Sequence, residues 1–250
     1  MIINNINLQL PTNSKQQNAS YNKKVTTQKP VDASDISVTA KMKSQLYGLK
    51  QVLRNINTAQ SFIAIADGYI ETSGSVIKKI KNLSMQATSN TVTKHDRQNM
   101  QVQVSALVDE VDRIASQAQF NRYNILTGDF SKRNPKASMW FHIGPNMNTR
   151  ERVYVATMTA QSFNLKQGWK LNVNLSSVIG AKKALNTIDY ALKKVSKQRA
   201  DLEGYSKRFK SAAESAIKTI ESINKHYDID ENKNETKQLI QMIRQKLDIN

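Results

Sequence analysis

The first half of the chain carries apolar residues at a seven-residue spacing, which is typical of a helix. A second apolar line lies beside the main one and begins with Leu46 and Leu53, but its later positions along the chain are no longer apolar. The apolar stripe therefore moves sideways around the helix, as in a helix that packs against two neighbours. The pattern predicts a long helix that begins within residues 32–35 and ends near Gln86. Its main line is Leu49, Ile56, Ile63, Ile70 and Ile77.

A second helix is predicted after a polar turn at residues 88–96. Its apolar positions between Met100 and Ala118 fall on one helical face, and the opposite face is charged. We expect that apolar face to be buried against the other long helices. The residues expected to pack there include Leu107, Val111 and Ile114.

Beyond this helix the hydrophobic period changes from about 3.6 to two, which is typical of strands. Residues 138–144 and 152–158 alternate, and turn-forming residues lie between them. The pattern predicts a β-hairpin at about 138–158. Residues 169–175 alternate again and are a candidate third strand.

The last long helix is predicted to start near Gly180, again with a seven-residue repeat. Leu185, Leu192, Ala213 and Ile220 are expected to form its second apolar line. A charged stretch at 226–236 interrupts the pattern, and a short amphipathic tail follows. The main line includes Ile188, Val195, Leu202 and Phe209.

These segments predict a mainly α fold, an elongated antiparallel bundle of long helices with a small β-hairpin region. The expected organisation has three parts, which are an N-terminal arm at 1–31, a helical core at 32–225, and a linker with a short C-terminal helix at 226–250. The arm is expected to be disordered because residues 11–31 are polar, bracketed by prolines and almost without aliphatic side chains.

Composition agrees with long helices and limits the chemistry. Only 8 glycines and 4 prolines occur in 250 residues, so few residues would break a helix. The absence of cysteine excludes a disulfide framework, thiol catalysis and cysteine-ligated zinc. The N-terminus has no basic region before an apolar run, so we expect no cleaved signal peptide. No window approaches 18 apolar residues, so no membrane insertion is expected.

No motif in the sequence predicts catalysis. A glycine-rich phosphate loop, the H-E-x-x-H motif and the G-x-S-x-G motif are all absent from the sequence. The three histidines lie in three different segments and do not resemble a ligand cluster. We therefore predict that the protein is not an enzyme and uses no cofactor and no metal.

The basic charge leaves three interpretations open. The net charge is +17, and residues 182–218 hold many of the lysines and arginines. This stretch is the solvated outer face of a helix, a face that meets an acidic subunit, or a phosphate-binding surface. The chain lacks a helix-turn-helix, a zinc finger and an RNA-stacking aromatic pair, which disfavours nucleic acid as a partner.

Several blocks of the sequence resemble the flagellin family. Residues 110–128, EVDRIASQAQFNRYNILTG, resemble the flagellin N-terminal signature, in which a helix ends in a polar-Phe-Asn turn before a short apolar strand. Residues 141–160 resemble the periplasmic flagellins of spirochaetes. Further similar blocks lie at 32–51, 77–90 and 191–209, so the resemblance extends over about 32–225 in the order of the family.

The resemblance implies a flagellin core fold and noncovalent polymerisation with other flagellin subunits into a filament of a periplasmic or extracellular flagellum. It also implies export through the flagellar apparatus without a cleaved signal peptide, with an export chaperone as a candidate partner. Within the signature, Phe120 is expected to anchor the turn in the core. Asn121 is expected to satisfy loose backbone groups.

The two ends of the chain depart from the family pattern. Flagellins use both termini to form paired amphipathic helices, whereas residues 11–31 lack an apolar stripe and the tail after residue 236 is short. We therefore expect a minor or accessory filament subunit and not the main filament former. Three alternatives remain, which are a basic binding protein on a flagellin-like scaffold, a hook–filament junction protein and a non-functional relic.

Overall fold

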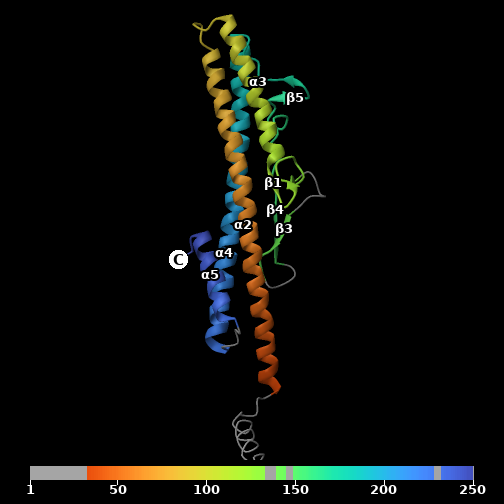
Figure 1. Cartoon of the computed structure of the whole chain (residues 1–250), viewed down its shortest axis with the longest axis vertical. Helices are drawn as coiled ribbons and strands as arrows, with labels where there is room; N and C mark the ends of the chain where they lie inside the picture. Colours follow the sequence, from red (N-terminus) through yellow and green to blue (C-terminus); the bar gives the residue numbers. More distant parts are fainter. Residues whose placement is uncertain (1–32, 133–138, 145–148, 228–231, 250) are drawn as a thin grey trace, which may run out of the picture. The chain divides into compact units, whose positions relative to one another are not determined.

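The computed structural model describes residues 33–132, 139–144, 149–227 and 232–249 (Figure 1). The chain divides into two compact units, Met1–Ser44 and Gln45–Asn250. In the first unit the described residues 33–44 are helical, and the expected N-terminal arm lies outside the described residues. The elements are α2 (Ala33–Ala87), α3 (Lys94–Gln117), β1 (Gln119–Phe120), β2 (Tyr123–Asn124), β3 (Met139–His142), β4 (Arg150–Val153), β5 (Lys166–Gln167), β6 (Lys170–Leu171), α4 (Val178–Tyr227) and α5 (Lys233–Leu247).

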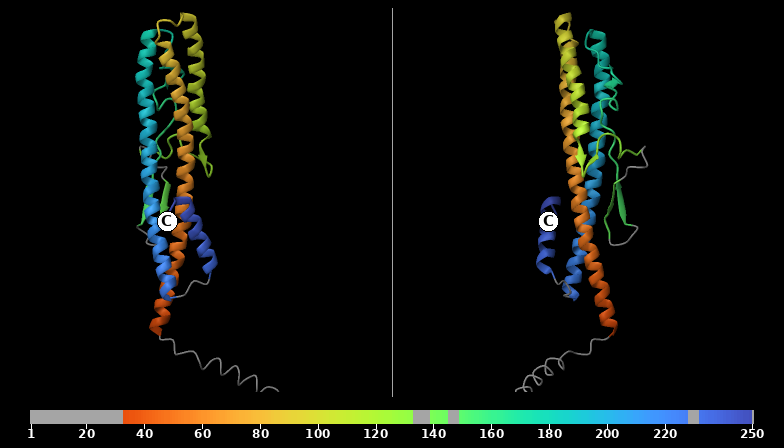
Figure 2. Two further views of the ribbon diagram at one scale, coloured as in Figure 1. Left: turned by 90° about the vertical axis from the view of Figure 1, so that its left-hand side faces the viewer. Right: turned by 45° about the vertical axis from the view of Figure 1, so that its right-hand side comes forward.

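The fold class is confirmed, because the chain is mainly helical with small antiparallel strand pairs. Within the second unit α4 runs antiparallel to α2, and α3 lies beside α2 (Figure 2). No helix within the described ranges is long and apolar enough to cross a membrane.

Helix α3 begins earlier than the sequence pattern suggested. The stretch expected to be a turn, 88–96, already contains its first residues, because Lys94 is helical. A capping box explains this start: the Thr93 hydroxyl accepts from the Asp96 backbone N–H, and the Asp96 carboxylate accepts from the Thr93 N–H. Two of the free N–H groups at the helix start are thereby satisfied.

The second apolar line of α4 differs from the expectation in its first half. Ala213 and Ile220 are buried as expected, but Leu185 and Leu192 are only half-buried, and Ala184 and Ala191 are buried in their place. Small residues on the line allow α2 and α4 to approach closely. A Cβ built on Gly74 of α2 would lie 3.1 Å from Val195 Cγ1.

Among the described residues the β structure consists of three two-stranded antiparallel pairs, β1–β2, β3–β4 and β5–β6. The predicted strand at 152–158 was wrong in extent, since β4 ends at Val153 and residues 154–158 are irregular. The candidate third strand at 169–175 contributes only β6, which pairs with β5 and not with the β3–β4 hairpin.

Helix α5 belongs to the same compact unit as the long helices. Ion pairs and hydrogen bonds join it to both α2 and α4. Its buried face consists of Thr236, Leu239, Ile240, Ile243 and Leu247. The amphipathic tail expected from the sequence therefore lies against the bundle.

Candidate functional site

The described residues between 119 and 175, here called the outer segment, are held on the helices by polar side chains. Gln101 of α3 donates to the Val173 carbonyl (3.0 Å) and accepts from the Leu175 N–H (2.6 Å). Gln198 of α4 accepts from the Ala156 N–H at 3.0 Å. These amides take the place of a neighbouring strand, because buried backbone groups need a partner. Residues 154–158 have further backbone partners, because the Val155 N–H donates to the Phe130 carbonyl (3.0 Å) and the Met158 N–H donates to the Leu126 carbonyl (2.9 Å).

An aromatic cluster joins the outer segment to the core. The buried Phe62 of α2 lies at its centre, with its ring centroid 5.3 Å from that of Phe120 and 6.1 Å from those of Phe130 and Phe141. Phe141 in turn lies 5.8 Å from Phe209 of α4. Such edge-to-face contacts add stability beyond area burial. The β1–β2 turn and the β3–β4 hairpin thus share one anchor.

The expectation that Asn121 satisfies loose backbone groups stays a prediction. Asn121 is exposed, and both Asn121 and Arg122 have positive φ, 47° and 68°. They form the tight connection between β1 and β2, which pair as Gln119↔Asn124 and Phe120↔Tyr123. Asparagine tolerates the left-handed region better than most residues, so its backbone conformation accounts for its place in this turn.

The predicted packing residues lie in three environments. Leu107 is half-buried at the edge of α3 and Phe120 is half-buried against Phe62, while Asn121 is exposed. A role of any of them in contacts between chains stays a prediction. The fully buried ones are Leu49, Ile56, Ile63, Ile70, Ile77, Val111, Ile114, Ile188, Val195, Leu202 and Phe209.

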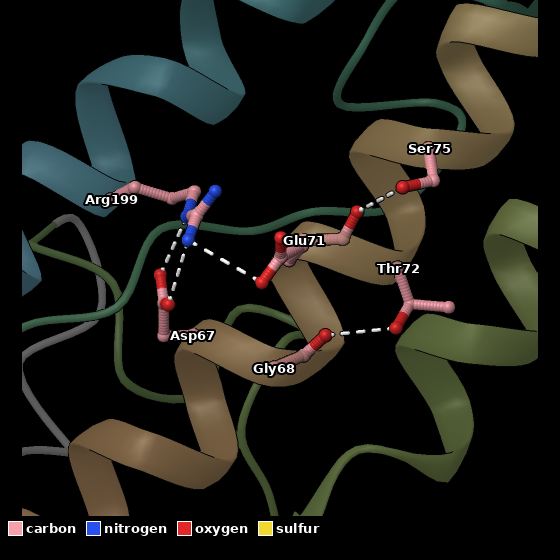
Figure 3. A network of polar contacts seen from close by, with 6 residues as sticks. All are labelled: Asp67, Gly68, Glu71, Thr72, Ser75 and Arg199. Atoms are coloured by element: carbon pink, nitrogen blue, oxygen red, sulfur yellow. Dashed lines mark hydrogen bonds and ion pairs between the residues drawn. The ribbon is translucent and has the colours of Figure 1, made fainter.

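A polar network sets the register of α2 against α4 (Figure 3). Arg199 of α4 makes a two-pronged contact with Asp67 of α2, at 2.8 Å through Nε and 3.0 Å through Nη2, and reaches Glu71 at 3.4 Å. The hydrogen bonds to Asp67 raise the pKa of Arg199 above its ordinary value. The planar guanidinium matches a carboxylate in only a few geometries, so this contact is directional.

Beside this network a groove of about 600 Å³ runs between the two helices. Asp67, Arg199 and Glu203 supply polar groups to its lining, and Ala64 and Ala200 are exposed along it. Further along the groove, the buried Gln60 of α2 donates through Nε2 to the Ser206 carbonyl of α4 at 3.1 Å. The groove is therefore a fixed feature of the α2–α4 surface.

A second ion pair fastens the outer segment to α3. Lys166 contacts Asp112 and lies 3.5 Å from Asp109, and the hydrogen bond to Asp112 raises the pKa of Lys166. Asp112 also accepts from the Ala160 N–H at 2.7 Å. One carboxylate thus holds two points of the outer segment.

The basic stretch at 182–218 is in part occupied by internal contacts. Lys194 donates to the Ser162 carbonyl and Lys210 to the Asp248 carbonyl. Lys207 pairs with Glu203, which lies one turn away, and Arg208 pairs with Glu151 of β4. The contacts of Lys194 and Arg208 hold the outer segment and that of Lys210 holds the end of α5, so these cations are engaged within the chain.

The β3–β4 hairpin carries a feature that the sequence analysis missed. The Arg150 guanidinium lies 4.7 Å from the Trp140 ring centroid, and the Arg152 guanidinium lies 5.4 Å from Trp140 and 4.6 Å from Tyr154. Lys132 lies 5.7 Å from Tyr154. We call these five residues the cation–aromatic ladder. The cross-strand pair Trp140↔Arg152 was detectable only once the register was known.

In the part of the chain that the structure describes, no three histidine or acidic side chains are placed to hold a metal ion. His95, His142 and His226 remain in separate elements, and His142 is exposed on β3.

Comparisons with known proteins give the chain a family. The family described as bacterial flagellin N-terminal helical region matches residues 2–131, so the match starts before the resemblance seen from residue 32. The flagellar filament core protein flaB2 of Brachyspira hyodysenteriae is 46% identical over 187 residues, which cover 73% of this chain and 66% of that protein.

Two proteins of Treponema are also similar. Flagellin FlaB1 of Treponema pallidum is 43% identical, over 71% of this chain and 64% of that protein. The flagellar filament 33 kDa core protein of Treponema phagedenis is 40% identical, over 80% and 77%. The chain thus spans slightly less than two thirds of the first two relatives and more than two thirds of the third.

Two solved structures have a similar fold. Bacillus cereus flagellin aligns with a TM-score of 0.53 at 19% identity, over 65% of this chain and 88% of that one. A putative flagellar hook-associated protein of Vibrio parahaemolyticus aligns with a TM-score of 0.62 at 12% identity, over 78% and 96%. At these identities the likeness concerns the fold alone. The family match and the similarity to filament core proteins show that this chain belongs to the flagellin family.

Proposed function

We propose that this protein is a structural subunit of a bacterial flagellar filament of the spirochaete periplasmic type and contributes to motility. The observation that carries the proposal is the 40–46% identity to proteins named flagellar filament core proteins or flagellins. The fixed register of α2 and α4 supports it, because a subunit of a regular polymer must present the same surface in every copy.

The proposed role requires no catalytic residue. The buried positions of α2 and α4, such as Ile56 and Leu202, would act by keeping the helix pair rigid, and the outer surfaces would make the contacts between subunits. We further propose that the chain is a minor or accessory subunit, with other flagellins as its partners. Export would proceed through the flagellar apparatus without a cleaved signal peptide, assisted by an export chaperone.

Co-assembly with flagellin tests the proposal. Labelled chain is mixed with flagellin monomers from the same organism under polymerising conditions, the polymer is pelleted, and the pellet is imaged by electron microscopy. Label at intervals along the filaments is expected. A chain that stays in the supernatant, alone and in the mixture, rules out a filament subunit.

Two variants make this experiment specific. Leu202→Asp places a carboxylate in the buried seam between α2 and α4, and this variant measures trapping of misfolded chain in the pellet. Lys182→Asp makes a change of the same kind at an exposed position of α4 and is expected to co-assemble. Equal pelleting of both variants would mean that the label marks trapping and not assembly.

A further inference from the structure

We propose that the cation–aromatic ladder on the β3–β4 hairpin is a docking surface for a second protein that presents clustered carboxylates. This partner is distinct from the flagellin subunits of the proposed filament. The inference goes beyond the filament role, because it concerns a surface formed by the folded chain before any polymer exists.

Charge in this region of the sequence is one-sided. Between Asp129 and Asp189 the only acidic residue is Glu151, whereas lysines and arginines recur throughout. Glu151 points to the inner side of the hairpin, where it pairs with Arg208 at 2.9 Å. It therefore does not neutralise the ladder on the other face.

The ladder cations differ from four other arginines of the molecule. Arg54, Arg113, Arg199 and Arg208 each contact a carboxylate of this chain. Within the described ranges, no carboxylate lies within ion-pair distance of the ladder cations Lys132, Arg150 and Arg152. A partner that supplies carboxylates would satisfy these donors.

The geometry favours carboxylates over bases and sugars. Each ring of the ladder already contacts two cations, Trp140 with Arg150 and Arg152, and Tyr154 with Arg152 and Lys132. A sugar or base that binds by stacking would have to displace them. The guanidinium N–H groups remain, and their planar fork matches a carboxylate in a bidentate arrangement.

The surface is also held in place before binding. Beneath it, Phe141 packs against Phe62 and Phe209, and the Asn55 side chain donates to the His142 carbonyl at 3.3 Å. A pre-organised surface loses little conformational entropy on association. The ladder is confined to one hairpin and its flank, so it forms a small patch. A small patch fits an acidic surface of a folded protein, whereas a long polyanion would need an extended row of cations.

Trp140 provides a direct readout of binding. The only other tryptophan, Trp169, is 96% exposed next to β6, so Trp169→Phe leaves Trp140 as the single tryptophan, which is excited selectively at wavelengths that tyrosine does not absorb. The probe is an oligoglutamate peptide, and a single-stranded oligonucleotide of equal charge is the phosphate competitor. We expect saturable quenching or shift of Trp140 fluorescence with the peptide, at lower affinity with the oligonucleotide.

Two double variants distinguish a specific effect of the ladder on binding from an effect of the net charge. Arg150→Gln with Arg152→Gln is expected to weaken peptide binding about tenfold or more, because each charged hydrogen bond is worth more than a neutral one. Lys182→Gln with Lys183→Gln removes the same two charges from exposed positions of α4 and is expected to change affinity less than about twofold. Circular dichroism checks that both variants are folded, and the exposed Arg150→Gln alone serves if the double variant is not.

Three results would overturn the proposal. Equal losses in the two double variants would reduce the effect to net charge, and tighter binding of the oligonucleotide would assign the surface to phosphate polymers. Loss of self-association in the ladder variant, measured by sedimentation of the chain alone, would make a second copy of this chain the occupant.

Discussion

Helices α3 and α5 each bury an apolar face against the rest of the bundle, but different contacts complete their attachment. α3 begins in a capping box and uses Gln101 and Asp112 to hold the backbone of the outer segment. α5 has no side-chain cap at its start, and its ties to α2 and α4 are exposed ion pairs and hydrogen bonds, such as Arg54–Glu235 and Arg244–Glu221.

The difference concerns what depends on each helix. Removing α3 would uncover part of the core and leave backbone groups at Ala160, Val173 and Leu175 without partners. Removing α5 would uncover one side of the α2–α4 pair and break contacts that water can replace. We therefore expect α3 to unfold only with the whole unit, and α5 to detach at a lower free energy.

A matched pair of core truncations provides the largest test. Ile114→Ala in α3 is expected to lower the free energy of global unfolding by about 2–4 kcal/mol, since both transfer energy and packing are lost. Ile243→Ala in α5 removes the same atoms from an equally buried site. The effect of Ile243→Ala on the free energy of global unfolding is limited, because α5 detaches before the rest of the unit unfolds. After it has detached, the substitution costs nothing more.

Urea unfolding and hydrogen exchange measured by mass spectrometry distinguish the two variants. The Ile243→Ala chain should show fast exchange confined to α5 and a smaller shift of the urea midpoint. The comparison fails if both variants lower the midpoint equally and exchange stays uniform.

The next test removes the side-chain amide of Gln101 in α3, which bonds the backbone of the outer segment. Gln101→Met keeps the length of the side chain but leaves the Val173 carbonyl and the Leu175 N–H unpaired, which is expected to cost about 2 kcal/mol. Gln103→Met makes the same change at an exposed position two residues away and should stay within about 0.5 kcal/mol of the parent. Thermal unfolding compares the two, and equal effects would mean that Gln101 does not hold the outer segment.

The helices were predictable because their signal repeats many times. The main lines of α2 and α4, from Leu49 to Ile77 and from Ile188 to Phe209, lie in the buried core. The first half of the second line of α4 was misplaced because the pattern favours the large Leu185 and Leu192, whereas close approach of the helices selects Ala184 and Ala191; Ala213 and Ile220 are buried as predicted.

The outer segment was less predictable because its order comes from tertiary contacts. Alternation at 152–158 is real, but beyond Val153 the backbone bonds to the Gln198 side chain and to the Phe130 and Leu126 carbonyls instead of to a neighbouring strand. The ladder depends on the register that places Trp140 opposite Arg152, and this register is set by the hairpin and not by composition. Local patterns therefore predicted the scaffold, while the surface features needed the packed structure.

The capping box of α3 gives a smaller, pH-dependent effect. Thr93→Ala is expected to cost about 1 kcal/mol near neutral pH, since it removes one partner of the box. Hydrogen bonds from Thr93 lower the pKa of Asp96 below its ordinary value of 3.8. A depressed folded-state pKa contributes stability that is present above the unfolded value and is lost as the pH falls through the folded one.

The cost of Thr93→Ala should therefore shrink as the pH falls from the ordinary value of 3.8 toward the lower folded-state pKa of Asp96, where its carboxylate becomes protonated. Urea titrations at pH 7 and pH 3 give the two values. A cost that grows on acidification would show that the Thr93–Asp96 contact does not stabilise the folded state.

The smallest expected effect concerns the ion pair between α2 and α5. Arg54 and Glu235 lie 2.8 Å apart, and both side chains are half or more exposed, so water and salt compete for each of them. A double-mutant cycle with Arg54→Met and Glu235→Gln isolates the pair from the other effects of each change. A coupling of about 0.2–1 kcal/mol is expected at low salt, decreasing toward zero near 1 M salt. A coupling well above this range that persists in salt would mean that α5 is attached as strongly as α3. The two helices would then have to unfold together.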